Sequence, residues 1–274
     1  MDGTPLSVSP SDLYARLGTA SAPVLIDVRR DEAFAADDKL IIGAFHRSPA
    51  DVESWLKNLP AGRQVVAYCS HGREVSQGVA TALRNAGLEA AYLEGGISGW
   101  KDGQLPTRRK LEDVSDKWVT REHPKVDRIA CPWLISRFIN PLAEFIYVPP
   151  NEVTAVARNT GATPYDIKGV EFGHVGDRCS FDAIVRVYDI HDPALDDLAT
   201  IVRGADTSRP DLMPQCEGLL AISYGLSRNF PDDREMLRHG MVIYDALYAW
   251  CRQQIAGRSA TKAGGEATTQ YVRT

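Results

Sequence analysis

Apolar runs in this sequence fall short of the roughly 20 residues that a membrane-spanning helix needs, so we expect no membrane span. The start, Met1 to Leu6, lacks the basic and apolar stretches of a secretory signal, and we therefore expect a cytoplasmic protein. Basic residues are also few, since 31 Lys and Arg stand against 36 Asp and Glu. The first 110 residues are neutral, and the remainder carries the whole net charge of −5. Neither part has the basic excess of a nucleic-acid binder, so we expect no nucleic-acid partner.

Cysteine is sparse as well. Its five positions are Cys69, Cys131, Cys179, Cys216 and Cys251. They form no Cys-x-x-Cys pair and no zinc-finger spacing, and their odd number suits a reducing compartment better than a disulfide framework. What is present, 44% hydrophobic and 24% charged residues, is typical of a soluble globular protein. At 274 residues, the chain has the length of two domains.

One cysteine lies in a segment with an informative pattern. A run of β-formers, 64–68, leads into Cys69, which is followed by a short polar loop and a helix-like run, Val75 to Leu83. Backbone N–H groups at the start of such a helix converge near the end of the strand, and the helix dipole adds positive potential. These surroundings stabilise a thiolate and make the cysteine a nucleophile. A buried structural cysteine is the alternative, but the polar residues after Cys69 favour the reactive interpretation.

Two further motifs surround this segment. The earlier strand 24–29 contains Asp27 and Arg29, and the later segment 94–100 reads Gly-Gly-x-x-x-Trp after its first residue. In this order the three motifs resemble a single rhodanese domain that covers residues 5–106. The resemblance implies an α/β fold, a parallel sheet flanked by helices.

The resemblance also implies roles for individual residues. Cys69 would be the catalytic, sulfur-carrying nucleophile. The loop that wraps its persulfide would consist of Ser70, His71, Gly72, Arg73, Glu74 and Val75. Asp27 and Arg29 would support the loop, and a buried structural ion pair is the alternative for these two.

The length of the loop separates two chemistries on this fold. Sulfurtransferases resemble this chain in having six loop residues, here Cys69 to Glu74. Related phosphatases carry one more residue and end in an arginine that grips the phosphoryl oxygens, where this chain has Val75. His71 and Arg73 give the rim positive charge suited to an anionic donor such as thiosulfate, whereas the carboxylate of Glu74 opposes it.

The second half has a different character. The segment 107–116 is polar and charge-dense, and we expect it to link two domains. Helical apolar spacing then dominates from 117 to 254, with a short strand at 144–148, and predicts a mainly α-helical domain. Pro132 interrupts one helical run and should kink it or start a new helix. The small and polar residues 255–274 are expected to form a disordered tail.

Two charged clusters stand out in this half, at 118–138 and at 170–181. These segments, their order and the final helical region resemble the C-terminal domain of chromate-resistance proteins over residues 117–254. The resemblance implies a connection to chromate. The N-terminal region usual in those proteins is replaced here by the rhodanese-like region.

The clusters allow three kinds of site. A metal such as Zn²⁺ or an iron-type ion suits a mixed set of ligands, and these candidates are Asp127, Cys131, Glu171 and His174. An oxyanion such as chromate or sulfate suits basic side chains near a helix start, and these candidates are Arg121, Lys125 and Arg128. The third interpretation is a structural network of ion pairs. The sequence leaves the three open.

The sequence as a whole predicts a rhodanese-type sulfurtransferase. The Cys69 thiolate takes a sulfane sulfur from a small-molecule donor such as thiosulfate and passes it to an acceptor such as cyanide or a thiol. The transfer needs no cofactor, whereas the second domain is expected to bind a metal ion or an oxyanion. Two alternatives stay open: a redox protein that handles chromate through Cys69 or Cys131, and a non-catalytic sensor of chromate or metal.

Overall fold

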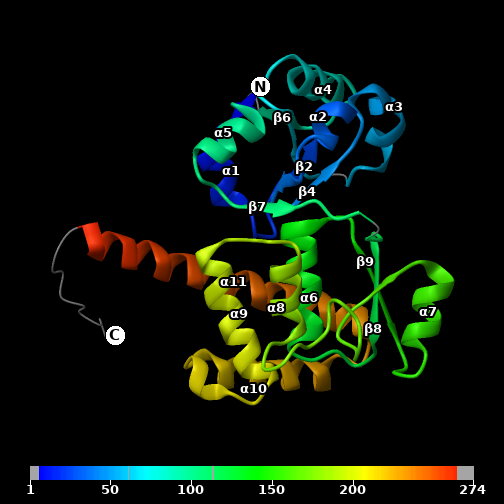
Figure 1. Ribbon diagram of the computed structural model, residues 1–274, viewed down its shortest axis with the longest axis vertical. Coiled ribbons are helices and arrows are strands. Elements are labelled where there is room, and N and C mark those ends of the chain that lie inside the picture. The colour runs from blue at the N-terminus through cyan, green and yellow to red at the C-terminus, as the bar shows by residue number, and fades with distance from the viewer. Residues whose placement is uncertain (1–5, 61, 113, 264–274) are drawn as a thin grey trace.

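The computed structural model describes residues 6–60, 62–112 and 114–263 (Figure 1). Figure 1 shows the blue and cyan N-terminal elements gathered in one lobe and the green to red elements in the other. The first lobe is an α/β domain and the second is mainly helical, which confirms the expected fold class. Among the described residues, no helix combines the length and the apolar character needed to cross a membrane.

The first domain is built on a parallel sheet with the strand order β1, β6, β5, β2, β4. Its strands are β1 (Ser7–Val8), β2 (Val24–Asp27), β4 (Ala44–His46), β5 (Val65–Tyr68) and β6 (Ala90–Leu93). Its helices are α1 (Pro10–Arg16), α2 (Asp31–Ala35), α3 (Val52–Trp55), α4 (Glu74–Asn85) and α5 (Gly96–Asp102), with short 3₁₀ turns at Pro49–Asp51 and Leu56–Asn58. Because β5 is the middle strand, Cys69 lies at the centre of the carboxyl edge of the sheet.

Helices cover both faces of this sheet because successive strand residues point to opposite sides. One face packs on α3 and α4 through Val24, Ile26, Val65 and Ala67. The other face packs on α1 and α5 through Leu25, Val66 and Tyr68. On α4 itself the buried residues recur at helical spacing and are Ser76, Val79, Ala80 and Leu83.

The second domain combines a small parallel sheet with several helices. The sheet has the order β10, β8, β9, formed by β8 (Lys117–Arg121), β9 (Glu144–Val148) and β10 (Thr163–Pro164). The helices are α6 (Asp127–Leu134), α7 (Val153–Thr160), α8 (Ser180–Val187), α9 (Pro193–Asp206), α10 (Gln215–Asn229) and α11 (Asp233–Ala263), with a 3₁₀ turn at Pro210–Leu212. The strand expected at 144–148 is confirmed as β9.

Pro132 neither ends α6 nor starts a new helix. The helix continues through it to Leu134 and then widens into a π-helical turn, Ile135–Ile139. A proline has no N–H for the carbonyl four residues earlier, which here belongs to Arg128. The hydroxyl of Tyr147 from β9 lies 3.5 Å from that carbonyl oxygen, so the neighbouring strand offers it a donor.

The segment expected to be a linker is an ordered part of the fold. It contains β7 (Thr107–Arg109), which pairs antiparallel with β3 (Lys39–Ile41). The buried guanidinium of Arg108 donates to the carbonyls of Ala44 at 2.6 Å and Ile139 at 3.1 Å. Polar composition therefore does not mark a free connection here, since Arg108 satisfies carbonyls from both domains.

The expected tail is also partly structured. α11 continues to Ala263, so the chain is helical from residue 255 to 263 rather than disordered. Residues 264–274 of the expected tail lie outside the described residues.

The two domains share an apolar core. Trp100 and Leu13 of the first domain belong to the same buried cluster as Phe138 and Tyr248 of the second. Gly18 makes this approach possible, because a side chain there would overlap the Tyr248 ring. The domains are therefore packed directly on each other.

Buried polar contacts reinforce this interface. The carboxylate of Asp192, which caps α9 by accepting from Leu195 N, also accepts hydrogen bonds from Tyr14 at 2.6 Å and Tyr248 at 3.0 Å. Arg252 of α11 lies over the Tyr14 ring and donates to the Tyr14 carbonyl at 3.0 Å. Burial, followed by the charge of Asp192, raises the pKa of Tyr14, so its hydroxyl stays a donor.

Candidate functional site

Cys69 occupies the first position after β5, where the chain turns toward α4. It is buried, with 7% of its surface exposed. The amide of Ile97 donates to the Cys69 carbonyl at 3.0 Å, and the amide of Ser98 donates to the Ser70 carbonyl at 3.0 Å. Cys69 Sγ lies 3.2 Å from the hydroxyl oxygen of Ser76 in the first turn of α4. The sulfur therefore faces the start of this helix from the bottom of the loop.

Hydrogen bonds determine the charge state of this thiol. Burial alone would raise the pKa of Cys69, but donors around the sulfur lower it below its ordinary value. These donors are the Ser76 hydroxyl and the backbone amides of Ser76, His71 and Arg73. Because they are neutral dipoles, they stabilise the thiolate without a partner cation. This environment suits a nucleophilic cysteine.

Two glycines make the tight loop possible. Gly72 and Gly96 both have positive φ angles, +66° and +57°. A Cβ on Gly96 would overlap the Cys69 carbonyl oxygen and lie 2.8 Å from the His71 amide nitrogen. The glycine pair of the later motif thus lets the backbone of α5 lie directly against the loop. Gln77 closes the loop from the other side by donating to the Gly72 carbonyl at 3.0 Å.

The charged residues of the loop lie on its outer side. His71, Arg73 and Glu74 are exposed, and Ser70 is half-buried. Val75 is also half-buried and packs against the core between the sheet and α4. The loop therefore presents no guanidinium at the position where the phosphatases of this fold carry their phosphate-gripping arginine.

Asp27 and Arg29 form a buried ion pair beside the site. The guanidinium donates to the Asp27 carboxylate at 2.6 Å and 2.9 Å, and also to Asp37 at 2.8 Å. A further bond runs from Arg29 to the Lys39 carbonyl at 2.9 Å. None of their hydrogen bonds among the described residues goes to the loop after Cys69. The geometry fits the structural alternative, in which the pair fixes the segment between β2 and β3.

Ser76 is a site residue that sequence reasoning missed. Its hydroxyl is buried and contacts both Cys69 Sγ and the Arg73 carbonyl, the latter at 3.3 Å. The helical spacing could have identified it. Ser76 stands three residues before the buried Val79 and therefore lies on the same face of the helix. A serine on the buried face of the helix after a reactive cysteine is placed to donate to the sulfur.

A cavity of about 1130 Å³ lies beside this site, between α3 and α4. Val75, Val79 and Ala82 line it, but Cys69 does not. The cavity therefore does not contain the reacting sulfur, and we place the candidate active site at the loop, where the hydrogen-bond donors converge.

The other four cysteines provide an internal control. All are buried, and burial raises the pKa of each thiol above its ordinary value. For Cys251 the pKa rises to about 12. Cys131 is fully buried, and the nearby charge of Asp127 further opposes its ionisation. Among the five cysteines, Cys69 alone has the lowered pKa that nucleophilic chemistry requires.

In the second domain the structure brings together part of the predicted metal set. His174 Nε2 lies 3.2 Å from an oxygen of Asp127, and it also lies 3.2 Å from Asp166 and 3.3 Å from Asp206. Glu171 is exposed and belongs to neither of the potential ligand groups among the described residues, and the same holds for the buried Cys131. Sequence reasoning missed Asp166 and Asp206, which no local motif marks.

The members of this cluster shift one another's pKa values. Burial, followed by the charge of Asp127, raises the pKa of Asp206 to about 7. The same two causes raise the pKa of Asp166. A hydrogen bond to Asp127 raises the pKa of His174 to about 9, against the effect of burial.

The three basic residues of the predicted oxyanion site lie on the same side of the domain. Arg121 donates to Asp166 at 2.6 Å, and Arg128 Nε lies 3.2 Å from the same carboxylate. Arg128 also donates to the backbone carbonyl of Glu122 at 2.9 Å. The ammonium group of Lys125 lies over the Tyr224 ring, 4.5 Å from its centre. Two of the three cations are therefore already engaged with a carboxylate, and the oxyanion site stays a prediction.

Comparisons with known proteins agree with this two-part architecture. Residues 9–103 match the rhodanese-like domain, and residues 118–251 match the C-terminal domain of ChrB. The protein ChrB of Cupriavidus metallidurans is 31% identical over 147 residues. That alignment covers 53% of this chain but only 44% of the relative, so the chain aligns with less than half of that protein.

Some solved structures are similar to this chain over a little more than a third of its length. A rhodanese-related protein from Thermoplasma volcanium is 21% identical, with a TM-score of 0.32, over 38% of this chain and 97% of its own. A protein from Lactobacillus plantarum is 28% identical, with a TM-score of 0.35, over 37% of this chain and 87% of its own. The chain thus joins a region that matches the rhodanese-like domain to a region that matches the C-terminal domain of ChrB.

Proposed function

We propose that this protein is a sulfurtransferase that carries sulfane sulfur on Cys69. The observation that carries the proposal is the position of the buried Cys69 Sγ, 3.2 Å from the Ser76 hydroxyl and faced by loop amides. The same donors that favour the thiolate also suit the terminal sulfur anion of a persulfide, since both are anions that accept hydrogen bonds.

The chemistry divides into two balanced steps. The Cys69 thiolate attacks the outer sulfur of thiosulfate, a new sulfur–sulfur bond forms, and sulfite leaves with the electron pair of the broken bond. Cyanide or a thiolate then attacks the terminal sulfur of the persulfide, and Cys69 leaves as a thiolate. No electron is gained or lost overall, so the cycle needs no cofactor.

The rim of the loop suits a small anionic donor. His71 and Arg73 are exposed beside the entrance to Cys69, and a guanidinium attracts an anion such as thiosulfate. Glu74 stands next to them and opposes this attraction. The donor is therefore an anion bound weakly at the rim before the sulfur reaches the buried thiolate.

The second domain supports a setting for this chemistry. Its likeness to the ChrB C-terminal domain, and to chromate-resistance proteins more broadly, connects the chain with chromate resistance. In this role the transferred sulfur or the persulfide would serve a cell exposed to chromate or to the oxidative stress that it causes.

The test is thiocyanate formation from thiosulfate and cyanide by the full-length protein. We expect turnover by the wild type, no turnover by Cys69→Ser, and near-normal turnover by the control Cys216→Ala, whose thiol has a raised pKa. Mass spectrometry after thiosulfate alone should show one added sulfur atom on Cys69.

Two results would contradict the proposal. Turnover that survives Cys69→Ser would move the chemistry elsewhere. Absence of both turnover and the added sulfur in the wild type would favour the alternatives, and chromate consumption that requires Cys69 would then identify a redox protein.

A further inference from the structure

We propose that the second domain binds one divalent transition-metal ion. Its ligands are Asp127, Asp166, His174 and Asp206. They come from four separate places: the first residue of α6, the turn after β10, the loop before α8 and the last residue of α9. Folding brings them together around His174 Nε2, and the proposal does not depend on the chemistry of Cys69.

The distances in this cluster are those expected between the ligands of one ion. When metal–ligand bonds are about 2.1 Å, adjacent ligand atoms around the ion lie about 3.0–3.4 Å apart. The three carboxylate oxygens nearest to His174 Nε2 lie 3.2 Å, 3.2 Å and 3.3 Å away. Each oxygen is therefore spaced from the imidazole nitrogen as a neighbouring ligand would be. The ligand atoms of Asp127, Asp166 and His174 all lie within 4.8 Å of one another, and Asp206 belongs with Asp127 to a second such group.

The cationic partners of this cluster are unevenly distributed. The nitrogen of His174 that faces the cluster carries at most one proton, so it can donate to one of the three carboxylates at a time. Asp166 has two arginines beside it. Asp127 and Asp206 have no cationic partner other than His174 among the described side chains. A divalent cation would give Asp127 and Asp206 a positive partner that both can contact at once.

Two of the carboxylates are also held by Ser180, through the same oxygens that face His174. The amide of Ser180 at the start of α8 donates to Asp127 at 3.3 Å, and its hydroxyl donates to Asp166 at 3.2 Å. Asp127 and Asp166 are 2% and 4% exposed, so their orientations are fixed by packing. Hydrogen bonds of this kind commonly orient the ligands of a metal site.

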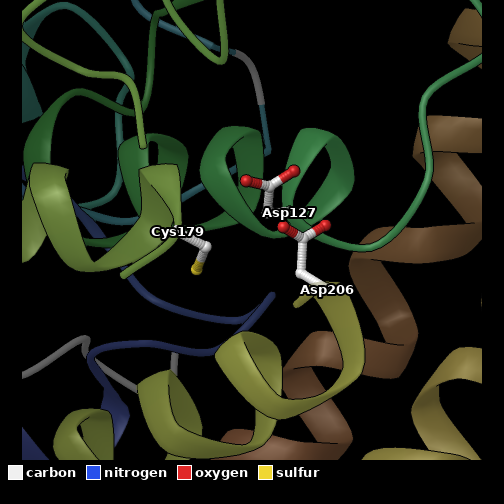
Figure 2. A group of neighbouring side chains, drawn as sticks. All are labelled: Asp127, Cys179 and Asp206. Atoms are coloured by element: carbon white, nitrogen blue, oxygen red, sulfur yellow. The ribbon is translucent and has the colours of Figure 1, made fainter. Parts of the chain in front are cut away.

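The donor atoms indicate the class of metal. One imidazole with several carboxylates suits Mn²⁺, Fe²⁺ or Zn²⁺ better than a soft ion that prefers thiolates. Figure 2 shows Asp206 reaching toward Asp127 with Cys179 close by. The thiol of Cys179 donates to a carboxylate oxygen of Asp182 at 3.5 Å, so we do not count it among the ligands.

An ion can reach this cluster from solvent. A cavity of about 280 Å³ has Asp127, Asp166 and Asp206 in its wall. His174 also lines it, with 43% of its side chain exposed. The site is thus open on one side, which leaves room for water on the ion.

The experiment starts from full-length protein stripped with a chelator. Titration calorimetry with Mn²⁺ and with Zn²⁺ should show one site per chain. His174→Gln and Asp206→Asn should each weaken binding by at least the roughly 10–100-fold that outer partners of a metal ligand cost. The matched control is His191→Gln, because His191 also contacts an aspartate, at 3.0 Å, but lies outside the cluster. The affinity of the His191→Gln variant for each ion should equal that of the wild type.

A second measurement uses the wild type alone and so does not depend on the folding of a variant. Diethylpyrocarbonate modifies accessible histidines, and bound Mn²⁺ or Zn²⁺ should protect His174 while leaving the exposed His191 reactive. Failure of the stripped protein to bind either ion would overturn the proposal. So would binding that neither protects His174 nor weakens in the two cluster variants.

Discussion

The Cys69 loop and the aspartate–histidine cluster of the second domain meet the same physical problem in opposite ways. Both bury ionisable groups. A charge on a buried group costs free energy because the group has lost its contact with water. Around Cys69, neutral amides and one hydroxyl stabilise the negative charge of the thiolate. They thereby lower the pKa of the Cys69 thiol. In the cluster, buried carboxylates lie close to one another and raise the pKa of Asp206 to about 7. The first arrangement is complete as it stands, whereas we propose that a cation completes the second.

The largest expected effect comes from a side chain that overlaps the Cys69 loop and displaces it. Gly96→Ala would place a methyl group on the Cys69 carbonyl at a φ angle of +57°. The loop must shift, and a displacement of about 1 Å at a reacting atom can reduce turnover about 100-fold. Thiocyanate formation measures the loss. Metal affinity of the second domain should be unchanged, and an equal loss of both properties would show that the two sites are not separate.

The next effect concerns the packing between the sites. Arg108→Met removes a buried guanidinium that bonds carbonyls of Ala44 and Ile139. Leaving two buried acceptors without donors should lower the free energy of unfolding by about 3 kcal/mol. Urea denaturation followed by tryptophan fluorescence measures it. We expect one transition because the core is shared, and two separate transitions would show that the domains unfold independently.

A smaller effect isolates one donor to the sulfur. Ser76→Ala removes the hydroxyl 3.2 Å from Cys69 Sγ, so the lowered pKa of Cys69 should rise toward its ordinary value. Only the thiolate reacts with iodoacetamide, and its fraction grows as pH rises through the pKa. The variant should therefore need a higher pH for half-maximal alkylation and react roughly tenfold more slowly near neutral pH, the equivalent of about 1.4 kcal/mol. An unchanged pH profile would assign the lowered pKa to the backbone amides alone.

The smallest expected effect is that of a substitution in the aspartate–histidine cluster on sulfur transfer at Cys69. His174→Gln should change thiocyanate formation by less than about twofold, since substitutions at separated positions usually act independently. The comparison is made on chelator-treated protein, so that metal binding does not differ between the two samples. A large change would mean that the cluster controls the Cys69 loop through the shared core.

The position of Cys69 between a strand and a helix could be predicted because the parts around it are local in the sequence. Strand, cysteine, loop and helix follow one another directly, so the pattern fixes where Cys69 lies and where the amides point. The second cluster could be predicted only in part. Asp127 and His174 lie in conspicuous segments, but Asp206 is simply the end of a helix and meets Asp127 through tertiary packing.

Polarity misled the sequence reasoning at the domain boundary. Arg108 and its neighbours were expected to link the two domains, because a charged run without apolar period is typical of a linker. The Arg108 guanidinium is in fact buried and donates to the backbone carbonyls of Ala44 and Ile139. Which carbonyls are left without a donor is a property of the assembled fold and is not visible in sequence.

The β7 strand has a consequence for taking the protein apart. A cut at residue 106, where the motifs end, would remove the partner of β3 and expose the surface of the first domain that packs on Phe138 and Tyr248. The isolated rhodanese-like fragment would then expose an apolar surface, and we expect it to aggregate. An expression fragment that is meant to stay soluble must keep the neighbouring helices, and a gene fusion that exchanges this module must exchange the matching interface with it.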